Sequence, residues 1–302
     1  MLKGMLRRIC RVAPLFALFL LPILHAEDGF FDSDGVRIHY TVEGAGEPVL
    51  LIHGYTASIA SNWAGPGIVK GLSDHYQVIG IDNRGHGQSE KPHDAAAYGH
   101  KMVADSLRLL DHLQIRKAHV VGYSMGGFFT LDLLAEHQDR LITATLGGAG
   151  YSTPQESKDR AGMLAQLADS LEQGQGIGPL IVALTPPGQQ PPPADQMAGI
   201  SKMMLSVNDP LALAAVARGG MPDVSDAKVR ASKAPALALI GENDPLKVGV
   251  DHLNGMMPNL KIVVIPGATH MTAFASPLFI QSLKSFLAEH PAGAARKATG
   301  TN

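Results

Sequence analysis

Short apolar segments alternate with helical segments along most of this chain, and that alternation limits the folds open to it. Residues 98–115, 125–140 and 276–290 are predicted helices. The segments with the length and apolar content of strands are residues 36–44, 47–54, 76–82, 118–124, 141–148, 234–244 and 260–270. Strands that alternate with helices form a parallel sheet covered by helices on both faces. The sequence therefore predicts an α/β protein.

One long segment, from about residue 149 to 233, interrupts this alternation. It contains helical pieces at 156–172 and 196–206 and the proline-rich sequence TPPGQQPPP, but no convincing buried strand. A segment of this length inside an α/β chain is more often a functional lid than a plain loop. We expect residues 149–233 to form a helical cap; the alternative is a small helical domain with no part in the site. Residues 27–148 and 234–290 then form the α/β core.

The first 26 residues have the order of a secretory signal peptide. Four cationic and no acidic side chains in the first 11 residues are followed by an apolar run of 13 residues, 12–24, and by the small residue Ala26. A membrane-spanning helix needs roughly 20 residues, and an uncleaved anchor is the alternative. We expect cleavage near Ala26, export to the periplasm or secretion, and no stable membrane span afterwards. The polar residues 291–302 are expected to be disordered.

Composition excludes several kinds of site. The only cysteine, Cys10, precedes the apolar run, so a chain cleaved near residue 26 has no disulfide, no cysteine nucleophile and no cysteine-ligated zinc. The formal net charge is −2 and the charges are scattered, which argues against a nucleic-acid interface. We expect no bound cofactor and no metal, and the sequence leaves the oligomeric state open.

The sequence GYSMG, residues 122–126, lies between a predicted strand and a predicted helix. A serine nucleophile at such a turn must stand exposed on a strained backbone, and Gly122 and Gly126 remove the Cβ atoms that would block the turn. The helix that follows directs its free amide groups toward the serine and favours a developing negative charge. Ser124 is therefore the predicted nucleophile, and a tight turn that happens to contain a serine is the alternative.

A serine hydroxyl needs a base, and the base needs an acid that orients it. His270 follows the strand segment KIVVIP through a short turn, and Asp244 follows the strand segment ALALIG. The C-terminal ends of parallel strands meet at one edge of the sheet, where Ser124 also lies. We predict His270 as the base and Asp244 as the acid. Glu242 is the alternative acid, and Asp82, which also ends a strand, is expected to anchor a loop.

An acyl-transfer site also needs hydrogen-bond donors for the oxyanion. The amide of Met125 follows the serine at the start of the helix, and the amide of Tyr55 follows a strand that ends in His53 and Gly54. Gly54 allows the backbone to approach the site closely. We predict the Tyr55 and Met125 amides as the oxyanion hole, with His53 and Gly54 as its supporting turn. An ordinary glycine turn is the alternative.

Four motifs, HGYT, DNRGHGQS, GYSMGG and GEND…GATH, make the chain resemble the α/β-hydrolase fold superfamily over roughly residues 30–290. The order Ser124, Asp244, His270 agrees with that family's order of nucleophile, acid and histidine. The resemblance implies a mostly parallel sheet of eight strands, with the helical cap inserted after the sixth. Haloalkane dehalogenases and epoxide hydrolases share this layout but use an aspartate nucleophile, whereas this chain has serine at position 124.

The resemblance and the predicted residues together imply an exported serine hydrolase, similar to carboxylesterases and lipases, that cleaves an ester-like bond of a small apolar substrate through an acyl-enzyme. A C–C bond hydrolase or a cofactor-free perhydrolase (haloperoxidase) would use the same three residues. A non-catalytic binding protein with a hydrolase fold would be expected to lack one of them. The candidates for lining the pocket, or for forming the core of the cap, are Met163, Met197, Met203 and Met204.

Overall fold

The computed structural model describes residues 27–293; the predicted signal peptide, residues 1–26, and residues 294–302 of the predicted disordered tail lie outside it. The strands are β1 (Glu27–Ser33), β2 (Val36–Glu43), β3 (Glu47–Ile52), β4 (Tyr76–Ile81), β5 (Ala118–Tyr123), β6 (Leu141–Gly147), β7 (Ala236–Gly241) and β8 (Leu260–Ile265). The helices are α1 (Ile68–Ser73), α2 (His100–His112), α3 (Met125–Glu136), α4 (Pro154–Glu172), α5 (Gly178–Ala183), α6 (Ala194–Leu205), α7 (Pro210–Gly219), α8 (Asp226–Ala231), α9 (Lys247–Leu253) and α10 (Pro277–Glu289). Short helical turns occupy Ala60–Ala64, Ala95–Ala97, Gln138–Arg140 and Ala273–Ala275. Within residues 27–293, no helix is both long enough and apolar enough to cross a membrane.

The eight strands that the structure describes form one sheet, in the order β1-β2-β4-β3-β5-β6-β7-β8. Strands β3 to β8 run parallel to one another, whereas β2 is antiparallel to both β1 and β4. The predicted α/β fold with a mostly parallel eight-stranded sheet is therefore confirmed. Sequence patterning did not single out β1, because most of its side chains are exposed or half-buried and it has no continuous apolar run.

The strand order changes direction at β3, and this change places the site. The chain passes from β3 to β4 on one side and then returns to β5 on the other side, so both β4 and β5 pair with β3. In an open parallel sheet such a switch point leaves a crevice at the C-terminal ends of the strands, and ligands bind there. Here His53 and Gly54 follow β3, and Ser124 follows β5. The crevice therefore lies between the predicted oxyanion loop and the predicted nucleophile.

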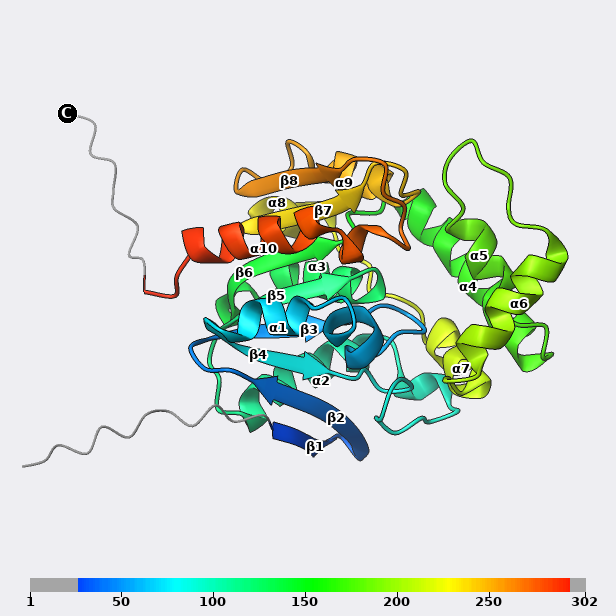
Figure 1. Cartoon of the computed structure of the whole chain (residues 1–302), viewed down its shortest axis with the longest axis horizontal. Coiled ribbons are helices and arrows are strands. Elements are labelled where there is room, and N and C mark those ends of the chain that lie inside the picture. Colours follow the sequence, from blue (N-terminus) through cyan, green and yellow to red (C-terminus); the bar gives the residue numbers. More distant parts are fainter. Residues whose placement is uncertain (1–26, 294–302) are drawn as a thin grey trace, which may run out of the picture.

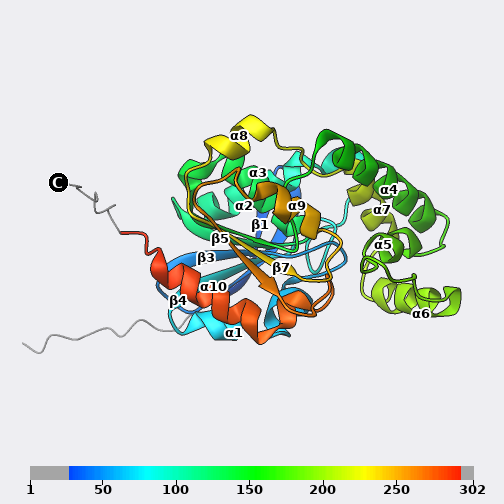
Figure 2. The same ribbon diagram turned by 90° about the horizontal axis from the view of Figure 1, so that it is seen from above.

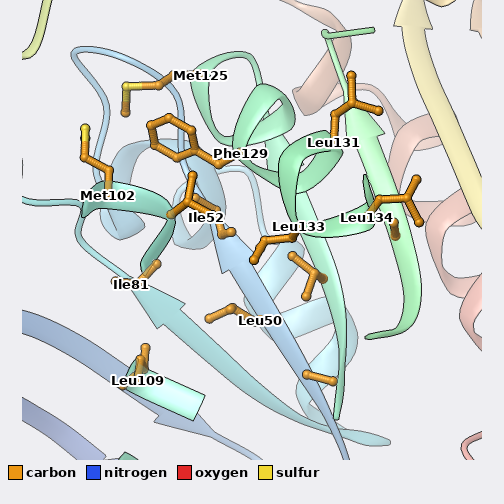
Figure 3. Packing of buried hydrophobic residues seen from close by; sticks show 14 of the residues in the cluster. Leu50, Ile52, Ile81, Met102, Leu109, Met125, Phe129, Leu131, Leu133 and Leu134 are labelled. Atoms are coloured by element: carbon orange, nitrogen blue, oxygen red, sulfur yellow. The ribbon is translucent and has the colours of Figure 1, made fainter. Parts of the chain in front are cut away.

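Helices cover both faces of the sheet, with α1 and α10 on one face and α2, α3, α8 and α9 on the other (Figure 2). The larger apolar cluster joins the sheet to α2 and α3, and Figure 3 shows Ile52 of β3 beside Phe129 of α3. A second cluster joins the opposite face to α1 and α10, through Leu72 and Phe279 among others. Buried apolar surface stabilises a fold by roughly 25 cal/mol per Å². Burial on both faces therefore holds the strand ends that carry the site.

The segment between β6 and β7 carries five helices and, throughout its described length, no strand. Helices α4 to α7 stand apart from the sheet, beyond the C-terminal ends of the parallel strands (Figure 1). We refer to α4 to α7 as the cap. They pack around a cluster of their own, in which Leu164 of α4 and Leu213 of α7 are buried. The side chains of Thr153 and Glu156 cap the start of α4 reciprocally. Helix α8 instead packs on α3, with Val229 in the main core cluster.

Candidate active site

Ser124 lies at the turn between β5 and α3, with φ +54° and ψ −115°. This conformation is strained for a residue other than glycine. Two backbone hydrogen bonds hold it: the Ser124 N–H donates to the carbonyl of Gly147 at 2.8 Å, and the Phe128 N–H donates to the carbonyl of Ser124 at 3.0 Å. Strand β6 and the first turn of α3 therefore maintain the strain, and the serine faces the pocket described below.

Gly122 and Gly126 are required by lack of space. A Cβ atom at Gly122 would lie 1.9 Å from the carbonyl oxygen of Gly126, and a Cβ atom at Gly126 would lie 2.0 Å from the carbonyl oxygen of Ile52 in β3. Both distances are far below van der Waals contact, so neither position accepts a side chain without movement of the backbone. The two glycines let the start of α3 approach β3 and β5, and this approach directs the free N–H groups of the helix toward the crevice.

His270 and Asp244 reach the serine from the loops after β8 and β7. Ser124 Oγ lies 2.9 Å from His270 Nε2, and His270 Nδ1 lies 2.8 Å from Asp244 Oδ2. The other carboxylate oxygen of Asp244 accepts the N–H of Leu246 at 2.9 Å, and both Asp244 and His270 are buried. A carboxylate at Nδ1 keeps the ring proton there and leaves Nε2 free to accept the serine proton. The structure thus brings the predicted nucleophile, base and acid into one hydrogen-bonded series.

Tyr123, for which no role was predicted, holds the loop that carries the histidine. Its hydroxyl donates to the carbonyl oxygen of His270 at 2.5 Å, and the centres of the two rings are 5.4 Å apart. Burial raises the pKa of Tyr123 well above its usual value, so the hydroxyl stays protonated and remains a donor. Phe274 and Phe279 pack against the same ring. The residue before the predicted nucleophile therefore also holds the backbone of the predicted base.

The two other acidic residues considered from the sequence lie elsewhere. Glu242 is exposed and accepts the N–H of Gly267 at 2.8 Å, in the loop that follows β8. Asp82 is buried and accepts two backbone N–H groups, from Ile59 at 2.8 Å and from Gln88 at 2.9 Å. Asp82 is therefore a loop anchor, and Asp244 is the carboxylate beside the histidine.

The amides of Met125 and Tyr55 are the predicted oxyanion donors, and both residues line the pocket that contains Ser124. Met125 is the first residue of α3, where an N–H group has no partner within its own helix. Among the residues that the structure describes, neither amide donates a hydrogen bond. A Cβ atom at Gly54 would lie 3.2 Å from the Cβ atom of Ser124, so the loop after β3 runs directly beside the serine.

His53 fixes the peptide plane that carries the Tyr55 N–H. Its Nε2 accepts the N–H of Asn83 at 3.0 Å, so a neutral ring has its proton on Nδ1, and Nδ1 then donates to the Gly54 carbonyl at 2.7 Å. Burial lowers the pKa of His53 and so keeps the ring neutral. In a planar trans peptide the C=O and N–H groups point in opposite directions. By holding the Gly54 carbonyl, His53 therefore orients the N–H of Tyr55.

A pocket of about 300 Å³ opens at Ser124 between the core and the cap. Its lining is mostly apolar and includes Phe128 and Leu246 from the core and Leu180 and Ala183 from α5. Such a site suits the apolar part of a small ligand. Within residues 27–293, no group of three or more His, Cys, Asp or Glu side chains is placed to hold a metal ion.

Of the four methionines considered for the pocket or for the core of the cap, only Met163 and Met204 lie in either place. Met163 lines the pocket, as does Met221, which was not singled out from the sequence. Met197, Met203 and Met204 do not line it; Met204 packs in the cluster of the cap, and Met203 is 66% exposed. Helical spacing alone does not distinguish these positions, because the place of each methionine depends on how the helices of the cap pack on one another.

Arg160 of α4 is a pocket residue that sequence reasoning missed. Its guanidinium lies 4.6 Å from the ring centre of Phe128, and it donates to Asp223 at 3.0 Å and to the hydroxyl of Ser152 at 2.5 Å. Burial lowers the pKa of Arg160 from its usual value. Glu156 and Asp159 also contribute to the lining. In the sequence, Arg160 belongs to a cluster of charged residues in the first turns of a predicted helix, and such a cluster usually faces solvent.

Comparison with known proteins gives a match to one family model. The model of the α/β hydrolase fold matches residues 47–180 of this chain. The matched range begins with β3 and ends in α5, so it includes the loop of Tyr55 and the turn of Ser124.

Two relatives and one solved structure illustrate the similarity. The 2-hydroxymuconate semialdehyde hydrolase of Pseudomonas sp. (strain CF600) is 36% identical over 122 residues, which are 40% of this chain and 43% of that protein. The putative 2-succinyl-6-hydroxy-2,4-cyclohexadiene-1-carboxylate synthase of Bacillus subtilis (strain 168) is 27% identical over 271 residues, which are 84% of this chain and 96% of that protein. A thermophilic esterase from Thermogutta terrifontis shares the fold with a TM-score of 0.68 at 24% identity, over 88% of this chain and 99% of that chain. The chain spans only 30% and 43% of the length of two relatives that are 37% and 36% identical to it.

Proposed function

Because this chain belongs to the α/β-hydrolase fold superfamily, we propose that it is a serine hydrolase that cleaves an ester-like bond of a small apolar substrate. The observation that carries this proposal is the hydrogen-bonded series Ser124–His270–Asp244, which opens onto a mostly apolar pocket beside the amides of Tyr55 and Met125. A binding protein would have no need for a strained serine aligned with a histidine and a carboxylate.

The proposed reaction has two stages. His270 Nε2 accepts the proton of Ser124 while Ser124 Oγ attacks the carbonyl carbon, and the N–H groups of Tyr55 and Met125 stabilise the oxyanion. The histidine then donates its proton to the departing alcohol, which leaves an acyl group on the serine. Water, deprotonated by the same histidine, attacks the acyl carbon; the bond to Ser124 Oγ breaks, the acid leaves, and the histidine returns the proton to the serine. Asp244 keeps the imidazole oriented and stabilises its charged form throughout.

Hydrolysis of p-nitrophenyl esters by the wild-type protein and by Ser124→Ala tests the proposal. We expect the variant to lose a factor of about 10³ or more in kcat, because removal of a triad member leaves only the residual effect of the oxyanion hole and of binding. Ser206→Ala is the matched control, since the Ser206 hydroxyl is exposed and donates to a backbone carbonyl of the cap. A fluorophosphonate probe should label the wild-type protein at Ser124. Equal hydrolysis by the wild type and by Ser124→Ala would exclude the assignment, and rates of both proteins equal to the uncatalysed rate would favour a non-catalytic protein.

A second candidate function is hydrolysis of a carbon–carbon bond next to a carbonyl group. It is supported by the 36% identity to 2-hydroxymuconate semialdehyde hydrolase over a segment of 122 residues. The same serine, histidine and aspartate would serve it. Incubation with 2-hydroxymuconate semialdehyde, beside the ester panel, separates the two candidates. A kcat/KM for this compound above that for every ester tested would favour C–C hydrolysis.

Peracid formation from a carboxylic acid and hydrogen peroxide is the corresponding assay for a perhydrolase.

We also propose that the protein is exported. The support is the order of cationic, apolar and small residues in the first 26 residues. Intact-mass measurement on protein from the cell exterior or periplasm should give a chain that begins near residue 27. A full-length chain retained in the membrane fraction would contradict cleavage and favour the anchor.

A further inference from the structure

The loop that carries the Tyr55 N–H is held from the core at Gly54. The Gly54 N–H donates to Asn62 Oδ1 at 2.9 Å. The Gly54 carbonyl accepts the His53 Nδ1–H at 2.7 Å and the Ala57 N–H at 3.2 Å. These partners belong to the α/β core, and they hold the carbonyl of the peptide group that carries the proposed oxyanion donor. They do not bond the side chain of Tyr55 or the residue after it.

Tyr55 and Thr56 are instead held from the cap. The Tyr55 hydroxyl donates to the carbonyl of Leu213 in α7 at 2.7 Å, and the Tyr55 ring packs against the cluster of the cap. Asn208, in the turn between α6 and α7, donates through Nδ2 to the carbonyl of Thr56 at 3.0 Å and to the carbonyl of Met204 at 2.9 Å. One short stretch of the cap, residues 204–213, therefore contacts both residues that follow Gly54.

Thr56 has a conformation that needs such support. Its φ is +62°, a region that β-branched residues rarely adopt. Its side chain is buried, and its hydroxyl lies 3.9 Å from the sulfur of Met204. A strained residue keeps its conformation only where the surrounding structure holds it. For Thr56 this support comes from the cap: Asn208 donates to its carbonyl, and the sulfur of Met204 lies near its hydroxyl.

We propose that the side chain of Asn208 and the hydroxyl of Tyr55 are positioning groups for the oxyanion hole, through which the cap, together with His53 of the core, keeps the Tyr55 N–H aligned with Ser124. The inference rests on the proposed function, because it takes the Tyr55 N–H as an oxyanion donor. Displacement of a catalytic group by about 1 Å costs on the order of 100-fold in rate. The cap therefore completes the catalytic geometry in addition to enclosing the substrate.

Kinetics of Asn208→Ala and Tyr55→Phe test this coupling, since each variant removes hydrogen bonds from the cap to the loop and leaves the triad intact. His93→Ala is the matched control: His93 Nε2 lies 2.9 Å from Asp209 Oδ2, so this contact also joins the core to the start of α7, but it does not touch residues 53–57. We expect kcat for p-nitrophenyl esters to fall about tenfold in each test variant, with KM changed less than about twofold, because a donor is misdirected rather than removed. The control should keep the wild-type kcat. A kcat that falls no more than in His93→Ala, or a rise in KM alone, would overturn the inference.

Hydrogen exchange separates failure of this inference from failure of the proposed function, because it does not depend on turnover. The Ala57 N–H, bonded to the Gly54 carbonyl, reports on the loop. Its exchange in a peptide that spans residues 53–58 should be faster in Asn208→Ala and Tyr55→Phe than in the wild type or in His93→Ala. Unchanged exchange in both test variants contradicts the inference whatever the activity. If exchange is faster in the test variants but the wild-type protein hydrolyses no ester, the coupling between cap and loop is supported and the proposed ester hydrolysis is contradicted. Comparable melting temperatures for all three variants show that global unfolding is not the cause.

Discussion

Gly126 and Gly162 are both helical glycines, but only the first is pressed against another element. An added Cβ atom at Gly126 would lie 2.0 Å from the carbonyl oxygen of Ile52, whereas one at Gly162 in α4 would have no heavy atom from outside its own helix within 4 Å. The start of α3, which carries the Met125 N–H, therefore depends on the missing side chain at residue 126.

We predict that Gly126→Ala lowers the free energy of unfolding by about 2 kcal/mol or more, because backbone atoms of α3 and β3 must separate. Ester hydrolysis should fall with it, since the shift turns the Met125 N–H away from the place where the oxyanion would form. Gly162→Ala should leave activity unchanged and raise the free energy of unfolding by up to about 1 kcal/mol. Urea unfolding curves for the three proteins measure this. A similar stability for both variants would show that α3 adapts more easily than its close approach to β3 indicates.

The placement of the candidate residues was predictable where it follows from strand ends. Ser124, Asp244 and His270 each follow a strand that is apolar in the sequence, and parallel strands bring their C-terminal ends to one edge. The roles of the Tyr123 hydroxyl and of the His53 ring were not predictable in the same way, because each depends on one bond, to the carbonyl of His270 or of Gly54. Such bonds depend on loop conformations that no short sequence pattern specifies.

At the scale of elements, a buried ion pair attaches the loop after β4 to α2. The guanidinium of Arg84 donates to both carboxylate oxygens of Asp105 at 2.6 Å, and both side chains are buried. Asp105 also accepts the hydroxyl of Ser33, the last residue of β1, at 2.5 Å. The pair therefore joins three elements at the edge of the sheet.

Asp105→Ala should lower the free energy of unfolding by about 3–5 kcal/mol, because it leaves a buried guanidinium without its partner. The matched control is Asp111→Ala on the same helix. Asp111 pairs with Arg140 at 2.7 Å but its side chain is 66% exposed, so its loss should cost less than about 1 kcal/mol. Thermal or urea unfolding of the wild type and of both variants measures these two losses of stability. Equal losses would mean that Arg84 finds water or another acceptor when Asp105 is removed.

The elements themselves were predicted unevenly, and the reason is physical. Strands β3 to β7 are apolar in the sequence because they are buried between two layers of helices. Strand β1 lies at an edge, pairs with one neighbour and keeps exposed side chains, so its pattern resembles that of a loop. Helix α7 was not predicted as a separate helix, although Asp209 caps its start and Pro210 follows as its first residue.

At the scale of the whole molecule, core and cap together form the pocket. Ala183 and Val182 are neighbours on α5, but Ala183 lines the pocket, whereas Val182 is 49% exposed and does not. Their side chains therefore test whether the space under the cap selects the substrate. The packing of α4 to α7 that creates this space involves residues distant in the sequence, which is why only Met163 of the four methionines considered lies there.

Ala183→Phe should raise KM for a long-chain p-nitrophenyl ester by about tenfold or more relative to the acetate, because the larger side chain fills part of the pocket. Val182→Phe should leave the ratio of the two KM values, long-chain ester to acetate, unchanged. Initial rates over a series of acyl lengths provide the measurement. A ratio that shifts equally in both variants would place the acyl group outside this pocket.

The insertion of α4 to α7 between β6 and β7 has a consequence for protein engineering. The strands are parallel, so their connected ends lie at opposite edges of the sheet, but the lobe itself begins after Ser152 and ends before Pro222, and these two residues line one small pocket. Residues of the inserted lobe can therefore be randomised for new selectivity while strand register is preserved. If the cap directs the Tyr55 amide as we propose, a library that keeps Asn208 and the backbone of α7 at Leu213 should yield many more active clones than one that varies the whole lobe.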